Sequence, residues 1–78
     1  MKPTFEIKNV VREGQRAYVR AKRLTPTDFA VSSVGSTLGG CRLKSLESGS
    51  SEEVFTFMLE SPGDASRLMP RAVVEFSG

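Results

Sequence analysis

Four side chains at alternate positions along one short stretch carry the clearest chemical signal in this sequence. They are Arg16, Tyr18, Arg20 and Lys22, called the basic segment below. In an extended strand, alternate residues leave the same face, and three cations around one aromatic ring suit a phosphate backbone with a base stacked on the ring. A solvated strand face has the same pattern, with the ring beside arginine stems. A nucleic-acid contact, a contact with an acidic protein patch and plain exposure are therefore the three interpretations.

Two further cations, Arg42 and Lys44, alternate in a later stretch and join the basic segment as candidate nucleic-acid-binding residues. Charge is distributed unevenly along the chain. Residues 1–44 hold nine bases and three acids, a balance of +6, whereas residues 45–78 hold two bases and six acids, a balance of −4. The formal net charge of +2 therefore conceals an asymmetry. It predicts a polarised surface, provided that the two halves do not interleave in space.

Residue types that enzymes commonly use are scarce. The chain has no histidine and one cysteine, which excludes Ser–His–Asp and Cys–His catalysis, His-containing zinc sites and an internal disulfide. Cys41 is predicted to be a buried small hydrophobe. Glu52 and Glu53 are too few oxygen ligands for a metal site, and no other carboxylates suggest an acid/base pair. We expect no enzyme, no catalytic residue, no cofactor and no metal.

The stretch from Gly35 to Gly40 has two glycines five positions apart, as a phosphate-binding P-loop does. A P-loop needs Lys and then Ser or Thr, followed by a helix. Cys41 and Arg42 follow instead, in a stretch that alternates like a strand. We expect a hairpin or bulge loop in which glycine supplies unusual dihedral angles; a partner-binding loop is the alternative.

The dominant hydrophobic period is two, which indicates strands. The expected strands are residues 4–11, 16–24, 29–34, 41–46, 54–60 and 71–76. Gly14 stands in the first turn where a positive φ would be needed. Ser61-Pro62-Gly63-Asp64 predicts a helix of about one turn, with Ser61 as N-cap and Asp64 in a capping box. The polar stretch 47–53 is predicted to be a mobile loop.

Six short strands in 78 residues predict one all-β domain, 1–78. Its expected form is a small closed or nearly closed barrel of about six strands, with one short helical turn before the last strand. The core candidates are Phe5, Ile7, Val19, Phe29, Val31, Leu43, Phe55, Phe57, Leu59, Leu68, Val73 and Phe76. This set exceeds one small barrel interior. Some of Phe55, Phe57, Leu46 and Met69 are therefore expected in an exposed apolar patch that suits a protein partner or self-association.

Two stretches of the chain resemble a known family. Phe5-Glu6-Ile7-Lys8-Asn9-Val10, a glycine turn and the strand from Arg16 to Ala21 resemble the start of domain 2 of translational GTPases, the β-barrel of the elongation factor Tu type. The stretch from Leu68 to Phe76 resembles a later segment of that domain, where a turn leads into a valine-rich strand. In that family a glycine follows the proline, where this chain has Arg71, and another glycine often ends the second strand, where this chain has Ala21 or Lys22. The 78 residues include no GTPase domain.

The resemblance implies a barrel that binds partners such as RNA ends, the ribosome or other domains, and performs no chemistry. We therefore expect a binding module that contacts RNA or a ribonucleoprotein through the basic segment. The alternative is a protein–protein adaptor that uses an apolar patch or a β-edge. The sequence has no apolar run long enough to span a membrane and no apolar region of a signal peptide. With its lone thiol, this predicts a cytoplasmic location.

Overall fold

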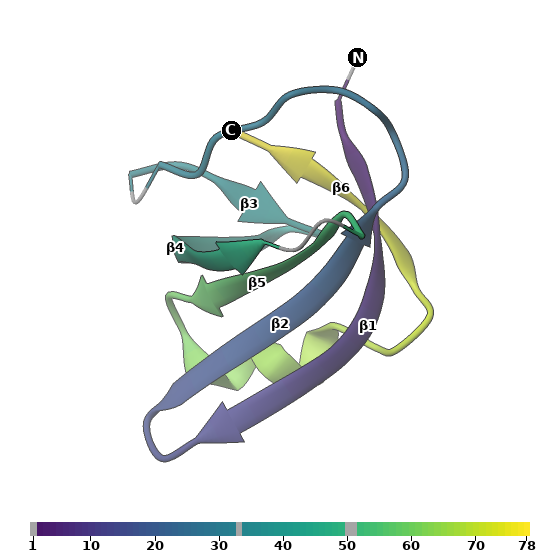
Figure 1. The fold of residues 1–78 in the computed structure, drawn as a ribbon. Coiled ribbons are helices and arrows are strands. Elements are labelled where there is room, and N and C mark those ends of the chain that lie inside the picture. Colours follow the sequence, from purple (N-terminus) through teal and green to yellow (C-terminus); the bar gives the residue numbers. More distant parts are fainter. Residues whose placement is uncertain (1, 33, 50–51) are drawn as a thin grey trace.

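Six strands close into one antiparallel barrel in the computed structural model of this chain (Figure 1). The structure describes residues 2–32, 34–49 and 52–78. The elements are β1 (Thr4–Glu13), β2 (Arg16–Arg23), β3 (Thr37–Leu38), β4 (Cys41–Gly49), β5 (Val54–Leu59), η1 (Pro62–Arg67) and β6 (Val73–Ser77). The strands are hydrogen-bonded in the order β1-β2-β5-β4-β3-β6, and β6 pairs with β1 to close the barrel. The predicted all-β barrel is confirmed.

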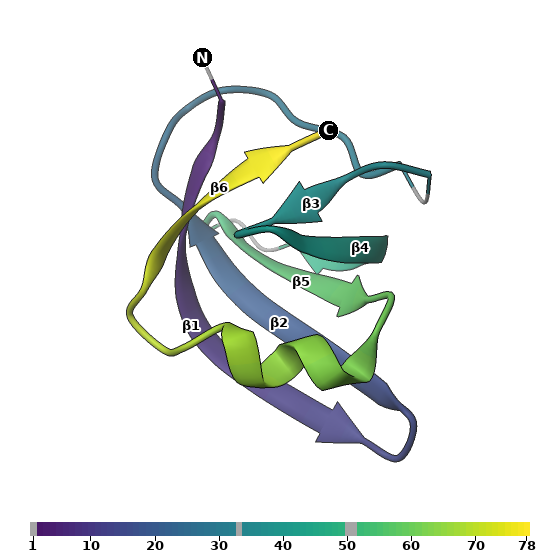
Figure 2. The same cartoon turned by 180° about the vertical axis from the view of Figure 1, so that it is seen from behind.

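The helical turn before the last strand is confirmed as the 3-10 helix η1, which lies across β1 and β2 in Figure 2. The predicted capping box is wrong. Ser61 makes no side-chain cap hydrogen bond. Instead, the backbone N–H of Asp64 donates to the carbonyl oxygen of Ser61 at 3.0 Å. This i→i+3 bond is the 3-10 pattern, and it satisfies the first turn through the backbone alone.

The predicted strand 29–34 is wrong. Residues 24–32 form a loop that crosses one end of the barrel, and the short β3 follows only at Thr37 (Figure 1). Phe29 and Val31 pack against the core from this loop. The alternating apolar residues of this segment therefore belong to a loop that covers one end of the barrel, without a strand partner. Ser33, which falls in the predicted strand, lies outside the described residues.

The polar stretch 47–53 is not wholly a loop, because β4 continues through Gly49. Two register shifts along β4 let it follow β5, so that Ser48 lies opposite Thr56 and Gly49 opposite Phe55. Ser50 and Ser51 lie outside the described residues. β6 begins at Val73 and not at Arg71 as predicted, because Arg71 has a φ of 72° in the preceding turn.

Two glycine turns match their predictions. Gly14 has a φ of 61° between β1 and β2. Gly39 and Gly40, with φ of 59° and 84°, join β3 to β4 where Leu38 lies opposite Cys41. Two positive φ angles in a two-residue hairpin loop are the signature of a type I′ turn. The hairpin interpretation of the glycine loop is therefore confirmed.

The core is centred on phenylalanine rings. Phe5 is fully buried, and its ring centroid lies 5.1 Å from that of Phe29, 5.5 Å from Phe57 and 6.2 Å from Phe76. Most core candidates are confirmed as buried or as packed against the core. Val73 is wrong: it is 62% exposed, because its position in β6 turns it outward.

Of the four apolar residues predicted to supply an exposed patch, two are exposed and two are not. Phe57 is fully buried and Phe55 is half-buried against the core. Leu46 and Met69 are exposed, as predicted, but they belong to β4 and to the turn before β6. The core candidates that exceed the barrel interior are accommodated because the loop 24–32 extends the core beyond the strands.

Candidate functional site

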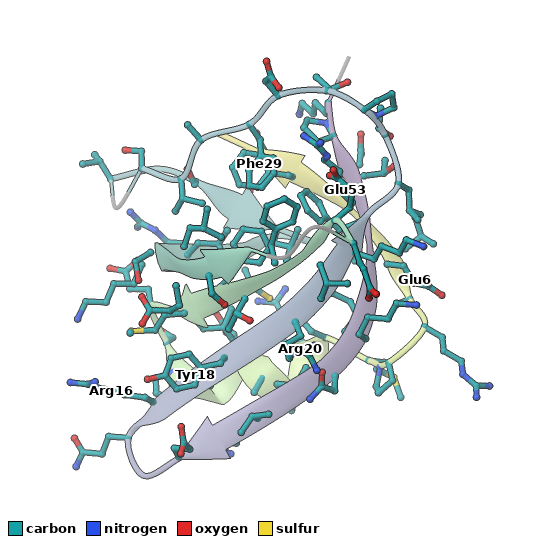
Figure 3. The ribbon with its side chains drawn as sticks, viewed as in Figure 1. Glu6, Arg16, Tyr18, Arg20, Phe29 and Glu53 are labelled. Atoms are coloured by element: carbon teal, nitrogen blue, oxygen red, sulfur yellow. The ribbon has the colours of Figure 1, made fainter. Side chains whose placement is uncertain are left out.

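The basic segment lies on β2, a central strand paired with β1 on one side and β5 on the other. Ala17, Val19 and Ala21 point inward and are fully buried. The alternate residues point outward: Arg16, Arg20 and Lys22 are exposed and Tyr18 is half-buried. Figure 3 shows Arg16, Tyr18 and Arg20 projecting from this strand. The one-sided burial predicted for this strand is confirmed.

Tyr18 stands in an apolar row that crosses three strands. Val11 of β1 lies directly opposite it on one side, and Met58 of β5 on the other. Side chains at such cross-strand positions are about 5 Å apart at Cβ. Val11 is 39% exposed, and Met58 is half-buried. The Tyr18 side chain therefore stands between two apolar neighbours and remains partly exposed.

A shallow depression of about 260 Å³ surrounds Tyr18 and Arg20, and we call it the Tyr18 depression. Its lining comprises Val11, Glu13, Tyr18, Arg20, Glu47 and Thr56. The lining comes from four strands: β1, β2, β4 and β5. It combines an aromatic ring, one guanidinium group, two carboxylates and one hydroxyl. This arrangement can stack a flat ring and form hydrogen bonds of both polarities around its edges.

Sequence reasoning missed four of these lining residues. Glu13 lies opposite Arg16 across the Gly14 turn, so the hairpin pattern contained a signal for it. Glu47 comes from β4, which pairs with β5 and not with β2. Its approach to Tyr18 depends on long-range strand order, for which the sequence carries no local signal.

The cations differ in whether they are already neutralised. Among the described residues, Arg16, Arg20, Lys22 and Lys44 make no ion pair. Arg42 is different: its Nε lies 3.1 Å from Glu60 Oε2, and its Nη2 donates to the carbonyl oxygen of Val34 at 3.0 Å. Four of the six candidates are thus cations without an ion pair to a described residue, and Tyr18 is neutral.

The six candidates do not form one cluster. Arg16, Tyr18, Arg20 and Lys22 stand together on β2. Arg42 and Lys44 lie on β4, with β5 between the two strands, which separates them by about 10 Å across the sheet. The outward positions of β5 between them, Thr56 and Met58, are uncharged. The structure therefore supports the basic segment as a unit and places the other two at its margin.

The condition for a polarised surface is not met. β5, from the acidic half of the chain, lies between the basic strands β2 and β4. β6, from the same half, lies between β1 and β3. The two halves interleave, so the charge asymmetry along the sequence does not by itself predict a polarised surface.

The remaining residues considered as sites, Cys41 and Glu53, interact with other parts of the fold. Cys41 is fully buried, as predicted, and its Sγ lies 3.9 Å from the carbonyl oxygen of Asp64. Burial raises the pKa of the Cys41 thiol, the Asp64 carboxylate raises it further and Arg67 partly lowers it. Glu53 has a φ of 65° and its Oε2 lies 2.6 Å from Arg23 Nη2. Over the described ranges, no three Cys, Asp or Glu side chains gather in a way that could hold a metal ion.

Comparison with protein-family models, with curated proteins and with solved structures found no match to this chain. In the part of the chain that the structure describes, no helix has the length and apolar character needed to cross a membrane. The basic segment and the Tyr18 depression are therefore the features that bear on function.

Proposed function

We propose that this protein is a non-enzymatic β-barrel module that binds single-stranded RNA, free or within a ribonucleoprotein, through the outer face of β2. One observation carries the proposal. Tyr18 lies half-exposed between cations that make no ion pair with any described residue. An accessible ring with unpaired cations around it is the arrangement that binds a base and its phosphates together.

The energetic contributions are of two kinds. Stacking of a base on an aromatic side chain contributes about 1–3 kcal/mol. Each phosphate neutralised on a single strand makes the logarithm of the binding constant fall with that of the salt concentration by about 0.7. If Arg16, Arg20 and Lys22 each neutralise one phosphate, the slope is about −2. Binding should therefore be detectable at low salt and weak at high salt.

The resemblance to domain 2 of translational GTPases belongs to this proposal. One feature supports it: Arg71, which replaces the glycine of that family, has a φ of 72°. This conformation is one that glycine adopts readily and other residues rarely. The turn thus has the backbone shape that a glycine at this position would serve. The lone, buried thiol of Cys41 suits a reducing compartment, and we include a cytoplasmic location in the proposal.

An NMR titration with a short single-stranded RNA at low salt tests the proposal. We expect salt-dependent shifts at Tyr18 and Arg20. Arg20→Gln should weaken binding several-fold and reduce the magnitude of the salt slope by about 0.7. Arg67→Gln is the matched control, since Arg67 is an exposed arginine of η1. Equal effects of the two variants, or no shift at Tyr18, would contradict RNA binding at this face.

A protein–protein adaptor is the second candidate, and the edge of β1 favours it. β6 pairs with β1 only at Thr4, Phe5 and Glu6. Among the described strands, residues 9–13 of β1 pair with β2 alone. Such an edge can accept a strand from a partner or from a second copy. Capture from lysate with and without nuclease separates the candidates, because nuclease should release an RNA-dependent partner and leave a strand-paired one bound.

A further inference from the structure

We infer that the Tyr18 depression selects a guanine base from the bound strand. The inference rests on the proposed RNA binding and adds base selectivity to it. Simple phosphate binding does not explain one feature of this site. Glu13 and Glu47 line the same depression as Arg20, and carboxylates beside a phosphate backbone would repel it.

The two carboxylates and the guanidinium have complementary hydrogen-bonding roles. An ionised carboxylate only accepts hydrogen bonds, whereas the arginine side chain only donates them. Guanine has acceptors, O6 and N7, on one edge and adjacent N–H donors, N1–H and the N2 amino group, on another. Of the four RNA bases, guanine alone offers two neighbouring donors to a carboxylate and two neighbouring acceptors to a guanidinium. The Tyr18 depression therefore has the donor and acceptor set that fits guanine.

The position of Glu47 supports a role in recognition. The hydroxyl of Ser45 donates to Glu47 Oε2 at 2.6 Å. This bond holds one carboxylate oxygen and orients the group, and no bond to the other oxygen is formed within the described residues. An oriented carboxylate loses less freedom when it accepts a hydrogen bond from a ligand.

The cations at the two ends of the basic segment can contact the phosphates of a bound RNA strand. Arg16 and Lys22 stand at the two ends of the basic segment, about 20 Å apart along an extended strand. With one base stacked on Tyr18 between them, phosphates on either side can reach these two cations. Arg16 and Lys22 thus contact phosphate alone and the carboxylates contact the base alone, whereas Arg20 can contact a phosphate of a strand without guanine or the acceptors of a bound guanine. Glu47 variants therefore report base recognition separately from phosphate binding.

The test uses a tryptophan reporter. The chain has one tyrosine and no tryptophan, so Tyr18→Trp places a single stacking fluorophore at the site. The probes are a uridine hexamer and three copies in which one central base is adenine, cytosine or guanine. We expect the guanine probe to bind about tenfold more tightly than the uridine probe, since one bidentate base contact discriminates by this order. In the wild-type protein, the ring signals of Tyr18 should shift most with the same probe.

Variants then separate the inference from the function it rests on. Glu47→Gln should remove most of the guanine preference, while the uridine hexamer should bind at least as tightly as it does to the wild type, because a carboxylate that repels phosphate is removed. Glu75→Gln, an exposed glutamate of β6, is the matched control and should leave the preference unchanged. If all four probes bind equally, the guanine inference is overturned and RNA binding stands. If no probe binds, both proposals are overturned.

Discussion

Two arginines three positions apart on β2 have opposite environments. Arg20 is exposed in the Tyr18 depression and makes no ion pair with a described residue. The side chain of Arg23 is only 19% exposed, with its Nη2 2.6 Å from Glu53 Oε2. Its Nη1 donates to the carbonyl oxygen of Thr27 at 3.1 Å. Arg20 is available to a ligand, whereas the interactions of Arg23 are satisfied by the fold.

The alternation of inward and outward side chains along β2 explains the difference. Odd-numbered positions of β2, such as Ala17, Val19 and Ala21, point into the barrel, and Arg23 shares their parity at the barrel mouth. There its guanidinium lies 5.9 Å from the ring centroid of Phe29 and 5.8 Å from that of Phe55. Arg23 thus closes the aromatic core and ties the loop 24–32 to it. The same residue type stabilises the fold from one face of a strand and offers a binding group from the other.

The largest expected effect tests Arg23. Arg23→Ala should lower the free energy of unfolding by about 2 kcal/mol, because it removes the hydrogen bond to the carbonyl oxygen of Thr27, two cation–π contacts and the ion pair with the half-exposed Glu53. Chemical denaturation measures this. Arg20→Ala, as the matched variant on the outer face, should change the free energy of unfolding by no more than about 0.5 kcal/mol. Similar values for the two variants would mean that the contrast between the faces is wrong.

The next effect concerns Tyr18. Tyr18→Leu keeps an apolar side chain in the row between Val11 and Met58 and removes the aromatic face. We expect RNA affinity to fall about tenfold, measured by fluorescence anisotropy with a labelled strand. The free energy of unfolding should change by less than about 1 kcal/mol. Unchanged affinity would show that no base stacks on this ring.

A third arginine, Arg71, differs from Arg67 in its backbone conformation. Arg71→Gly should raise the free energy of unfolding by about 0.5–1 kcal/mol, because glycine adopts a φ of 72° without the steric cost of a Cβ. Thermal unfolding measures the change. Arg67→Gly in η1, where no positive φ occurs, should instead be destabilising. A loss of stability in Arg71→Gly would mean that the arginine side chain contributes more than its conformation costs.

The smallest effect comes from the buried thiol of Cys41. Its pKa is raised by burial in the folded chain, so the unfolded chain loses the thiol proton first as pH rises. The stabilising contribution is complete below the ordinary thiol pKa of about 8.5 and is lost as pH rises through the folded pKa. Unfolding measured from neutral to alkaline pH should show a decline that is shallower in Cys41→Ala. Equal declines in the two proteins would indicate that the thiol contributes nothing.

Much of the site could be predicted because strand parity is local. The alternation from Arg16 to Lys22 was sufficient to assign the outward face of β2, and the absence of an activating histidine favoured burial of Cys41. The strand predicted at 29–34 was wrong because a loop can bury alternate residues as well as a strand can. The depression could not be predicted, since Glu47 approaches Tyr18 only through the pairing of β4 with β5.

The sequence by itself determined the strand-rich class, the glycine turns and which side chains share a face, because each depends on the conformation of a few neighbouring residues. Only the tertiary structure decided which strands are neighbours, how the basic and acidic halves interleave, and that Arg23 supports the core while Arg20 meets solvent. The physical reason is that strand order and barrel closure depend on contacts between residues distant in sequence. Those contacts place Glu47 beside Tyr18 and Arg20, whereas the local hairpin of β1 and β2 brings Glu13 there.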